Sequence, residues 1–253
     1  MNLNFTIAAV LLKRCWQNML MSLRANHLCF AYPGEKLILD NLCFELVGGE
    51  LHFVVGANGS GKSTLLQCLS RLLSPASGSI DSATRVAYLP QTVSPSQDFS
   101  VWQVIELGAR LGADCDIDKL MLQLNIDHLA SRRLSQLSGG ERQRVLIASV
   151  LAEQPEFLLL DEPSSSLDIH HQVELFELLK TFCADGLGIA VVCHDWNIAS
   201  RYADRISIVH DKKIMQSGKS QDVITASNLQ HIFGNTVSVS QLNNFQVVVP
   251  AHE

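Results

Sequence analysis

The sequence contains no apolar run that approaches the roughly 18–20 residues needed to cross a bilayer as a helix. It has no basic block either, since 19 lysines and arginines stand against 25 acidic residues, for a formal net charge of −6. Aromatic residues make up only 6% of the chain and do not alternate with basic ones. We therefore expect no nucleic acid partner.

Paired cysteine motifs are also absent. The seven cysteines are an odd number, and no two of them form a C-x-x-C pair. Disulfide frameworks use even numbers of cysteines, and structural zinc sites need clustered thiols. The cysteines are therefore interpreted as small apolar residues of a protein in a reducing compartment.

The N-terminus lacks the charge order of a secretory signal, because Lys13 and Arg14 follow the apolar stretch 5–12 instead of preceding it. We expect residues 1–20 to form an extension outside the domain, with Met21 as an alternative start.

The remaining 21–253 predict one α/β domain with a substantial core, since 47% of the residues are hydrophobic. The stretches 157–160 and 189–192 are continuously apolar, as in parallel strands buried on both faces. The first two strands flank a turn at 32–35 and suggest an antiparallel layer. A helical subdomain at about 92–152 interrupts the alternation of strands and helices, and the tail after 219 predicts two short helices and a weak pair of strands. The expected strands are 23–30, 42–47, 51–55, 85–89, 157–161, 189–193 and 205–209, and the expected later helices are 101–111, 116–124, 140–152 and 170–183.

A glycine-rich loop follows the strand at 51–55 and precedes a helix that starts near Ser63. It matches G-x-x-x-x-G-K-[ST], the loop whose backbone N–H groups surround a phosphate at a helix N-terminus. Lys62 would reach the β- and γ-phosphates, and the Ser63 hydroxyl would bind Mg²⁺. The residues expected to bind the nucleotide here are Gly56, Ala57, Asn58, Gly59, Ser60, Gly61, Lys62, Ser63 and Thr64.

Two carboxylates end the apolar strand at 157–161. Ligands of open α/β sheets bind at the carboxyl ends of strands. Asp161 would hold Mg²⁺ through water, and Glu162 would act on the attacking water as general base or by orienting it.

A second candidate anion site lies at Ser138, Gly139 and Gly140. Ser138 and Glu141 form the S-x-x-E pattern of a capping box, and the glycines expose backbone N–H groups at a helix N-terminus.

With these motifs in this order, residues 23–253 resemble the nucleotide-binding domain of ABC transporters. The resemblance implies the P-loop NTPase fold of that family, with an N-terminal antiparallel β-subdomain and an inserted helical subdomain. It also implies ATP and Mg²⁺ as cofactors. In this family the L-S-G-G signature completes the ATP site of the opposite subunit, so the resemblance implies a homodimer.

The resemblance assigns further roles to single residues. Tyr32 corresponds to the aromatic residue that stacks on adenine, and Gln91 to the Q-loop glutamine that touches Mg²⁺ and the transmembrane partner. His194 corresponds to the H-loop histidine at the γ-phosphate, which makes Lys62, Glu162 and His194 the catalytic candidates. The segment 164–168 resembles the D-loop. Glu141 and Ser166 depart from the commonest residues without removing a catalytic group.

Within the family, the segment 194–205 and the ending 222–234 are similar to the ATPases of ferric-siderophore, haem and vitamin B12 importers. This likeness implies transmembrane permease subunits as partners, a periplasmic or surface substrate-binding protein as an indirect partner, and a peripheral position on the cytoplasmic face of the inner membrane. It does not identify the transported compound or the permease.

Other ABC classes fit less well or stay open. A chromosome-type ATPase would carry a long coiled coil where only about 75 residues separate the loop and the signature, and a translation-associated protein would carry two such domains. A non-transport ATPase of iron–sulfur cluster assembly has the same catalytic motifs and stays open. His170 and His171 are interpreted as surface residues, because adjacent residues diverge around a helix.

Overall fold

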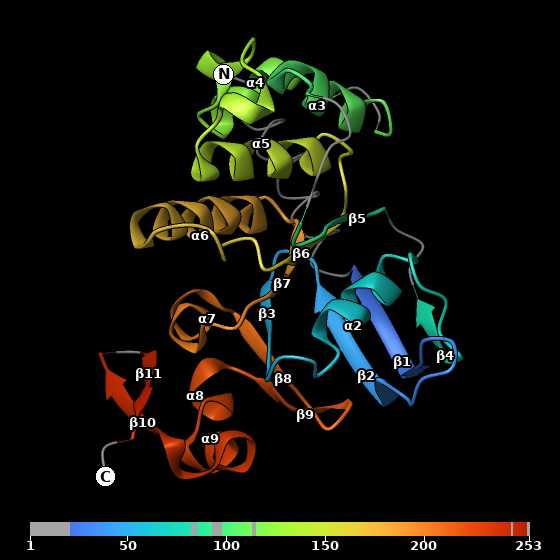
Figure 1. The fold of residues 1–253 in the computed structure, drawn as a ribbon, viewed down its shortest axis with the longest axis vertical. Helices are drawn as coiled ribbons and strands as arrows, with labels where there is room; N and C mark the ends of the chain where they lie inside the picture. Colours follow the sequence, from blue (N-terminus) through green and yellow to red (C-terminus); the bar gives the residue numbers. More distant parts are fainter. Residues whose placement is uncertain (1–20, 82–84, 93–97, 113–114, 244, 252–253) are drawn as a thin grey trace, which may run out of the picture.

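The computed structural model describes residues 21–81, 85–92, 98–112, 115–243 and 245–251. The expected extension at 1–20 lies outside the described residues. Figure 1 shows a central sheet with a group of helices above it, a smaller sheet beside it, and the C-terminal elements below. Among the helices of the described residues, none combines the length and apolar composition of a bilayer-spanning helix.

The central sheet has the strand order β5-β6-β7-β3-β8-β9. Its first five strands are parallel and β9 is antiparallel to β8. Every residue of β3, β6 and β7 is buried. For β6 and β7 this confirms the prediction from the apolar stretches 157–160 and 189–192. The strands are β3 (Leu51–Val55), β5 (Val86–Leu89), β6 (Phe157–Asp161), β7 (Gly188–Val192), β8 (Arg205–His210) and β9 (Lys213–Gly218).

Helices cover the two faces of this sheet differently. On one face, α6 (Ile169–Ala184) and α7 (Trp196–Tyr202) share a core with β3, where the rings of Phe53 and Phe176 are 5.4 Å apart. On the other face, α2 (Lys62–Leu69) packs in a second core with a three-stranded antiparallel sheet. That sheet has the order β2-β1-β4 and consists of β1 (Ser22–Phe30), β2 (Leu39–Val47) and β4 (Ser77–Asp81). The predicted antiparallel N-terminal layer is thus confirmed.

The helical subdomain lies between β5 and β6 in sequence. Ser100, Asp116 and Ser138 accept backbone N–H bonds at the starts of its three helices, so each helix begins at a side-chain cap. The first and third helices pack closely, because a Cβ on Gly108 would lie only 1.8 Å from the carbonyl oxygen of Ser149. The helices are α3 (Val101–Ala109), α4 (Ile117–Gln123) and α5 (Gly139–Leu151), with short turns η1 (Asp127–Leu129) and η2 (Leu134–Gln136).

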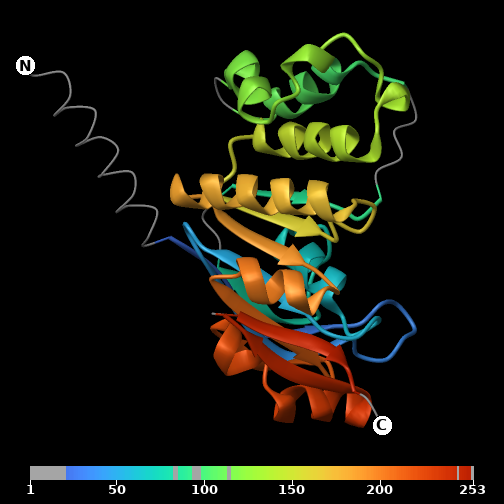
Figure 2. The ribbon, with the colours of Figure 1, turned by 90° about the vertical axis from the view of Figure 1, so that its left-hand side faces the viewer.

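The C-terminal hairpin packs on α7, as Figure 2 shows for the red strands and the orange helix. The side chain of Asn197 pairs with the backbone of Val248: its Oδ1 accepts the N–H at 2.7 Å and its Nδ2 donates to the carbonyl at 3.2 Å. The Ser200 hydroxyl accepts the N–H of Gln246 at 2.9 Å. The elements after β9 are α8 (Ser220–Val223), α9 (Ala226–Phe233), η3 (Gly234–Thr236), β10 (Val237–Leu242) and β11 (Phe245–Pro250).

The expected elements are present, with three additions. The sequence analysis did not predict β4, β9 or α7, and it began β2 three residues too late, at 42 instead of Leu39. The strand β4 is mostly exposed and polar, and β9 is half exposed, with Ile214 and Met215 as its apolar residues. Neither shows the apolar pattern used to recognise strands. The predicted pair of short helices and pair of strands in the tail is confirmed.

Candidate nucleotide site

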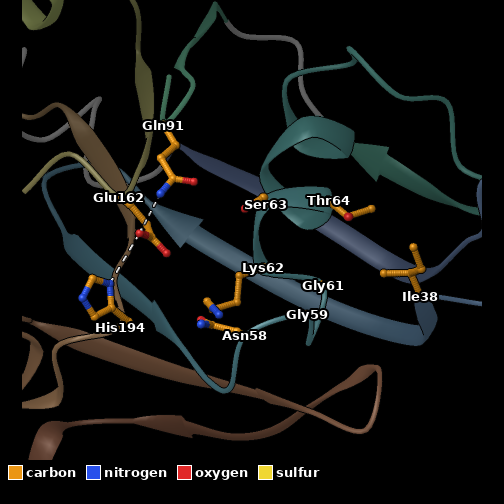
Figure 3. A pocket seen from close by; sticks show the side chains of 10 residues that line it. All are labelled: Ile38, Asn58, Gly59, Gly61, Lys62, Ser63, Thr64, Gln91, Glu162 and His194. Atoms are coloured by element: carbon orange, nitrogen blue, oxygen red, sulfur yellow. Dashed lines mark hydrogen bonds and ion pairs between the residues drawn. The ribbon is translucent and has the colours of Figure 1, made fainter. Parts of the chain in front are cut away.

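An open cavity of about 540 Å³ lies where the N-terminus of α2 meets the carboxyl ends of β6 and β7 (Figure 3). Parallel α/β sheets bind ligands at this edge. The cavity gathers residues from five separate parts of the sequence. Its lining residues are Ile38, Asn58, Gly59, Gly61, Lys62, Ser63, Thr64, Gln91, Glu162 and His194.

The loop 56–61 leads from β3 into α2 and adopts a backbone that requires glycine. Gly61 has φ 102°, and a Cβ there would lie 2.9 Å from Cδ2 of Leu39 and 3.2 Å from the carbonyl oxygen of Ile38. Within the described residues no side chain caps the start of α2. The helix therefore presents an uncapped N-terminus to the cavity, which favours an anion.

Lys62 is buried at the first turn of α2, with 6% of its surface exposed. Its ammonium donates hydrogen bonds to the carbonyl oxygens of Gly56 at 3.0 Å and Ala57 at 2.9 Å. Burial lowers the pKa of Lys62, while Glu162 and Asp161 oppose this shift. Among the described residues it forms no ion pair within 4 Å, so this cation is held by loop carbonyls and lacks a direct anionic partner.

Asp161 ends β6 as a buried carboxylate between two hydroxyl groups. Ser63 Oγ donates to its Oδ1 at 3.1 Å, and the Tyr88 hydroxyl donates to its Oδ2 at 3.3 Å. Burial raises the pKa of Asp161, and these two hydrogen bonds lower it. The phenol itself is affected, since burial and the nearby carboxylate raise the pKa of Tyr88 to about 12.

Glu162 follows with a left-handed backbone, φ 49°, which is uncommon outside glycine and turns the chain sharply at the strand end. Its Oε2 accepts a hydrogen bond from Gln91 Nε2 at 3.0 Å and lies 3.4 Å from His194 Nδ1 (Figure 3). The side chain of Glu162 is 18% exposed and that of His194 is 59% exposed. A partly buried carboxylate thus faces the cavity between an amide and an imidazole.

These groups fit a nucleotide phosphate and a magnesium ion. A buried ammonium without an ion pair, beside an uncapped helix start, suits an anion. Mg²⁺ prefers hard oxygen ligands, and it usually takes only a few of them from the protein and the rest from phosphate and water. The hydroxyl of Ser63, the carboxylate of Asp161 and the amide oxygen of Gln91 are ligands of this kind.

The structure brings most of the predicted site residues together. The cavity wall includes Gln91, Glu162 and His194, and six of the nine residues predicted at 56–64. The other three, Gly56, Ala57 and Ser60, belong to the same loop but do not line the cavity. Tyr32 does not line the cavity. Its ring packs edge-on against Phe30 at 5.0 Å, and its hydroxyl donates to Gln67.

The signature residues Ser138, Gly139 and Gly140 also lie away from this cavity, at the start of α5 in the helical subdomain (Figure 1). The predicted capping box is present. Ser138 N–H and Oγ donate to Glu141 Oε2 at 2.8 and 2.9 Å, and Ser138 Oγ accepts the Glu141 N–H at 3.3 Å. These two bonds from Ser138 lower the pKa of Glu141.

Two features were missed from the sequence. Tyr88 was not identified as a site residue, although its hydroxyl contacts Asp161. The alternation of β5, with Ala87 and Leu89 buried in one core, could have placed Tyr88 on the opposite face. Ile38 also lines the cavity, and no motif around it in the sequence indicated a role in binding.

The two adjacent histidines differ in their surroundings. His170 is exposed, as predicted, and pairs with Glu174 at 3.4 Å. His171 was also predicted to be a surface residue. Its side chain is 41% exposed, and its ring in addition lies against Gly140 on α5. Among the described residues, no group of three or more His, Cys, Asp or Glu side chains is arranged to hold a metal ion.

Comparison with known proteins gives consistent matches. The ABC transporter family matches residues 39–165, just over half of the chain. The cobalamin import ATP-binding protein BtuD of Halobacterium salinarum is 37% identical over 225 residues, which cover 80% of this chain and 56% of that protein. The chain thus spans little more than half the length of this relative. The ferric enterobactin transport ATP-binding protein FepC of Escherichia coli is 35% identical over 236 residues, covering 84% of this chain and 87% of FepC.

A solved structure, assigned to an inward-facing metal-chelate type ABC transporter, has a chain that superposes with a TM-score of 0.81. It is 27% identical, and the match covers 92% of this chain and 98% of that one. The chain belongs to the ABC transporter family, as one of its ATP-binding proteins.

Proposed function

We propose that this chain hydrolyses Mg-ATP at the cavity beside α2, as half of a dimer, and so drives uptake of a metal-chelate compound through a separate membrane permease. The main support for ATP hydrolysis is that four side chains lie together at one edge of the central sheet, those of Lys62, Asp161, Glu162 and His194. Phosphoryl transfer needs positioning and charge neutralisation more than covalent chemistry, and this edge provides both.

In this proposal the residues divide the work. Lys62 leaves its loop carbonyls to bind the β- and γ-phosphates, and the backbone of 56–61 binds the remaining phosphate oxygens. Glu162 orients the attacking water and accepts its proton, with Gln91 and His194 fixing the carboxylate. Ser63, Asp161 and Gln91 would hold Mg²⁺, which would supply additional positive charge.

A second copy of the chain would complete the site. The cavity is open, and the signature residues 138–140 do not line it. Their exposed N-terminus on α5 is built like an anion site, with glycines at its first two positions. The signature of one copy would therefore cover the nucleotide bound by the other, while Tyr32 would stack on adenine.

The transported compound is proposed from the relatives. BtuD is named for cobalamin import and FepC for ferric enterobactin transport, and both compounds are metal chelates. The chain would act on the cytoplasmic face of the inner membrane, with the permease docked near Gln91 and a substrate-binding protein on the far side. Gln91 suits this coupling because it contacts Glu162 and leads into the helical subdomain.

The role of Glu162 is tested by Glu162→Gln. The amide keeps the shape and can still accept from Gln91, so binding should persist while turnover falls by roughly 10²–10⁴-fold, the usual contribution of a general base. Gel filtration with ATP should show a dimer that retains nucleotide. The control is Glu177→Gln on an exposed position of α6. Near-normal turnover of Glu162→Gln would count against the assignment.

Shared sites are tested by mixing two damaged chains, Lys62→Ala and Ser138→Arg. A mixed dimer combines one doubly damaged site with one intact site, so activity should reappear on mixing. Mixed dimers that are confirmed by crosslinking and yet inactive would contradict independent shared sites.

The transport role is tested in a deletion strain without a redundant ATPase. Uptake of labelled ferric siderophore, haem and cobalamin is measured, and loss of one of these is expected. Normal uptake of all three would instead favour an ATPase of iron–sulfur cluster assembly.

A further inference from the structure

The first turn of α6 touches the signature segment of the same chain. A Cβ on Gly140 would lie 2.9 Å from Cδ2 of His171 and 3.2 Å from its Cγ. Real Cβ atoms essentially never approach other atoms within 3.0 Å. The imidazole ring of His171 therefore lies directly against Gly140, and a methyl group at this position would displace the ring.

The same ring is held from its other side by the D-loop segment (164–168). Nδ1 of His171 lies 2.8 Å from Oδ1 of Asp168, and that oxygen also accepts the backbone N–H of His171 at 2.9 Å. A carboxylate only accepts hydrogen bonds, so Nδ1 carries the proton in this contact. Asp168 caps α6, which fixes where the D-loop segment ends.

Neighbouring contacts hold these two segments together. Gln172 Nε2 donates to the carbonyl oxygens of Ser164 at 3.2 Å and Leu167 at 3.1 Å, which shapes the D-loop segment from within. One turn further along both helices, Arg144 of α5 pairs with Glu174 of α6. The helices α5 and α6 thus meet at two successive contacts, Gly140 with His171 and Arg144 with Glu174, and the first of these contacts includes the signature.

We propose that His171 is a positioning residue that sets the placement of the signature segment relative to the D-loop segment. This inference rests on the proposed shared site, in which both segments face the partner copy. His171 does not line the nucleotide cavity, so it acts through Gly140 and Asp168 and not on ATP itself. Its loss changes how well the dimer closes on ATP and leaves the P-loop half of the site intact.

Two substitutions separate the parts of this contact. His171→Leu keeps a bulky side chain and removes the hydrogen bond to Asp168. His171→Asn keeps a donor, because its Nδ2 lies as many bonds from Cα as the imidazole Nδ1. We expect kcat to fall by roughly tenfold or more in His171→Leu, since misplacement by about 1 Å can cost 10²-fold. His171→Asn should retain most of the turnover. The affinity of both variants for Mg-ADP should stay within about twofold of the wild type, because His171 does not line the nucleotide cavity and makes no contact that distinguishes the bound from the free state.

The control is His170→Ala, which removes the adjacent exposed imidazole and its pair with Glu174. It should leave turnover unchanged. A double-mutant cycle tests the ring contact directly. Gly140→Ala places a methyl group where the ring lies, so its cost to turnover should be at least about threefold smaller in a His171→Ala background, an interaction typical of residues in contact.

The outcomes are distinct. Low kcat in His171→Leu, rescue by asparagine and an unchanged Mg-ADP affinity support the inference. Wild-type turnover in His171→Leu, an equal loss in His170→Ala, or additive effects of Gly140→Ala and His171→Ala would overturn it. A parallel loss of thermal stability and of Mg-ADP affinity would reduce His171 to a folding contact and also overturn it. Failure of the proposed function shows separately, as an inactive wild-type protein, and overturns both.

Discussion

Replacing Tyr88 with phenylalanine removes one of the two hydroxyl groups that hold Asp161. Tyr88 lies on β5, paired in register with Leu159 of β6, and its hydroxyl donates to Oδ2 at 3.3 Å. Ser63 donates to Oδ1 from the opposite side. Phenylalanine fills the same space, so the substitution changes the hydrogen bonding of the carboxylate and little else.

The size of the effect follows from the geometry. A hydrogen bond to a charged group contributes about 1.5–3 kcal/mol. At 3.3 Å this bond is longer than the usual range of about 2.5–3.0 Å for O–H···O contacts, so we take about 1 kcal/mol. Since 1.4 kcal/mol corresponds to a factor of ten, the loss corresponds to about fivefold. Without the hydroxyl, the pKa of Asp161 rises further, and the carboxylate is less firmly oriented toward Mg²⁺.

The assay is ATP hydrolysis as a function of free Mg²⁺ at fixed ATP. Tyr88→Phe should raise the half-saturating Mg²⁺ concentration about fivefold and leave the rate at saturating Mg²⁺ within about twofold, because the lost bond orients a ligand of the metal. Tyr202→Phe is the matched control, since it removes a buried phenolic hydroxyl that has no hydrogen-bond partner among the described residues. An unchanged Mg²⁺ dependence in Tyr88→Phe, or an equal shift in the control, would refute the reasoning.

Three further predictions concern single polar groups. Removing the unpartnered hydroxyl in Tyr202→Phe should raise the free energy of unfolding by about 1 kcal/mol, measured by urea titration, because an unsatisfied buried group costs about 1–3 kcal/mol. Burial lowers the pKa of His52 to about 3, so the unfolded chain binds the extra proton and stability falls as pH drops below about 6.5. Between pH 7 and 5 this group should cost about 2 kcal/mol, and His52→Gln, which can keep the bond to Ser207, should flatten that slope. Glu141→Gln keeps the cap on Ser138 and removes one exposed negative charge beside the expected anion site, so ATP-dependent dimerisation should need about two- to fivefold less ATP at low salt and converge with the wild type at high salt.

The parts of the fold that could be predicted are those whose sequences have a single physical solution. The apolar strands β6 and β7 can only be buried, and the loop before Lys62 can only turn where glycines allow it. The edge strands β4 and β9 could not be recognised, because an exposed strand is specified by its neighbour's hydrogen bonds and not by its own side chains. The short helix α7 was also missed.

The site residues also differ in how well the sequence predicts them. Residues adjacent in sequence, such as Asp161 and Glu162, were found because their chemistry and position at a strand end are visible together. Tyr88 was missed, since its hydroxyl meets Asp161 across 73 positions of sequence. The contact of His171 with Gly140 was missed, because helix geometry alone excludes a metal pair with His170 but says nothing about which helix packs against α6.

The pairing of Asn197 and Ser200 with β11 links the C-terminal hairpin to the segment beside the cavity. The helix α7 begins two residues after His194, and two of its polar side chains bond to the backbone of 246–248. The strand β11 itself contributes no residue to the cavity lining. A substitution that separates β11 from α7 would therefore remove hydrogen bonds from the helix that follows His194 without touching any residue of the cavity.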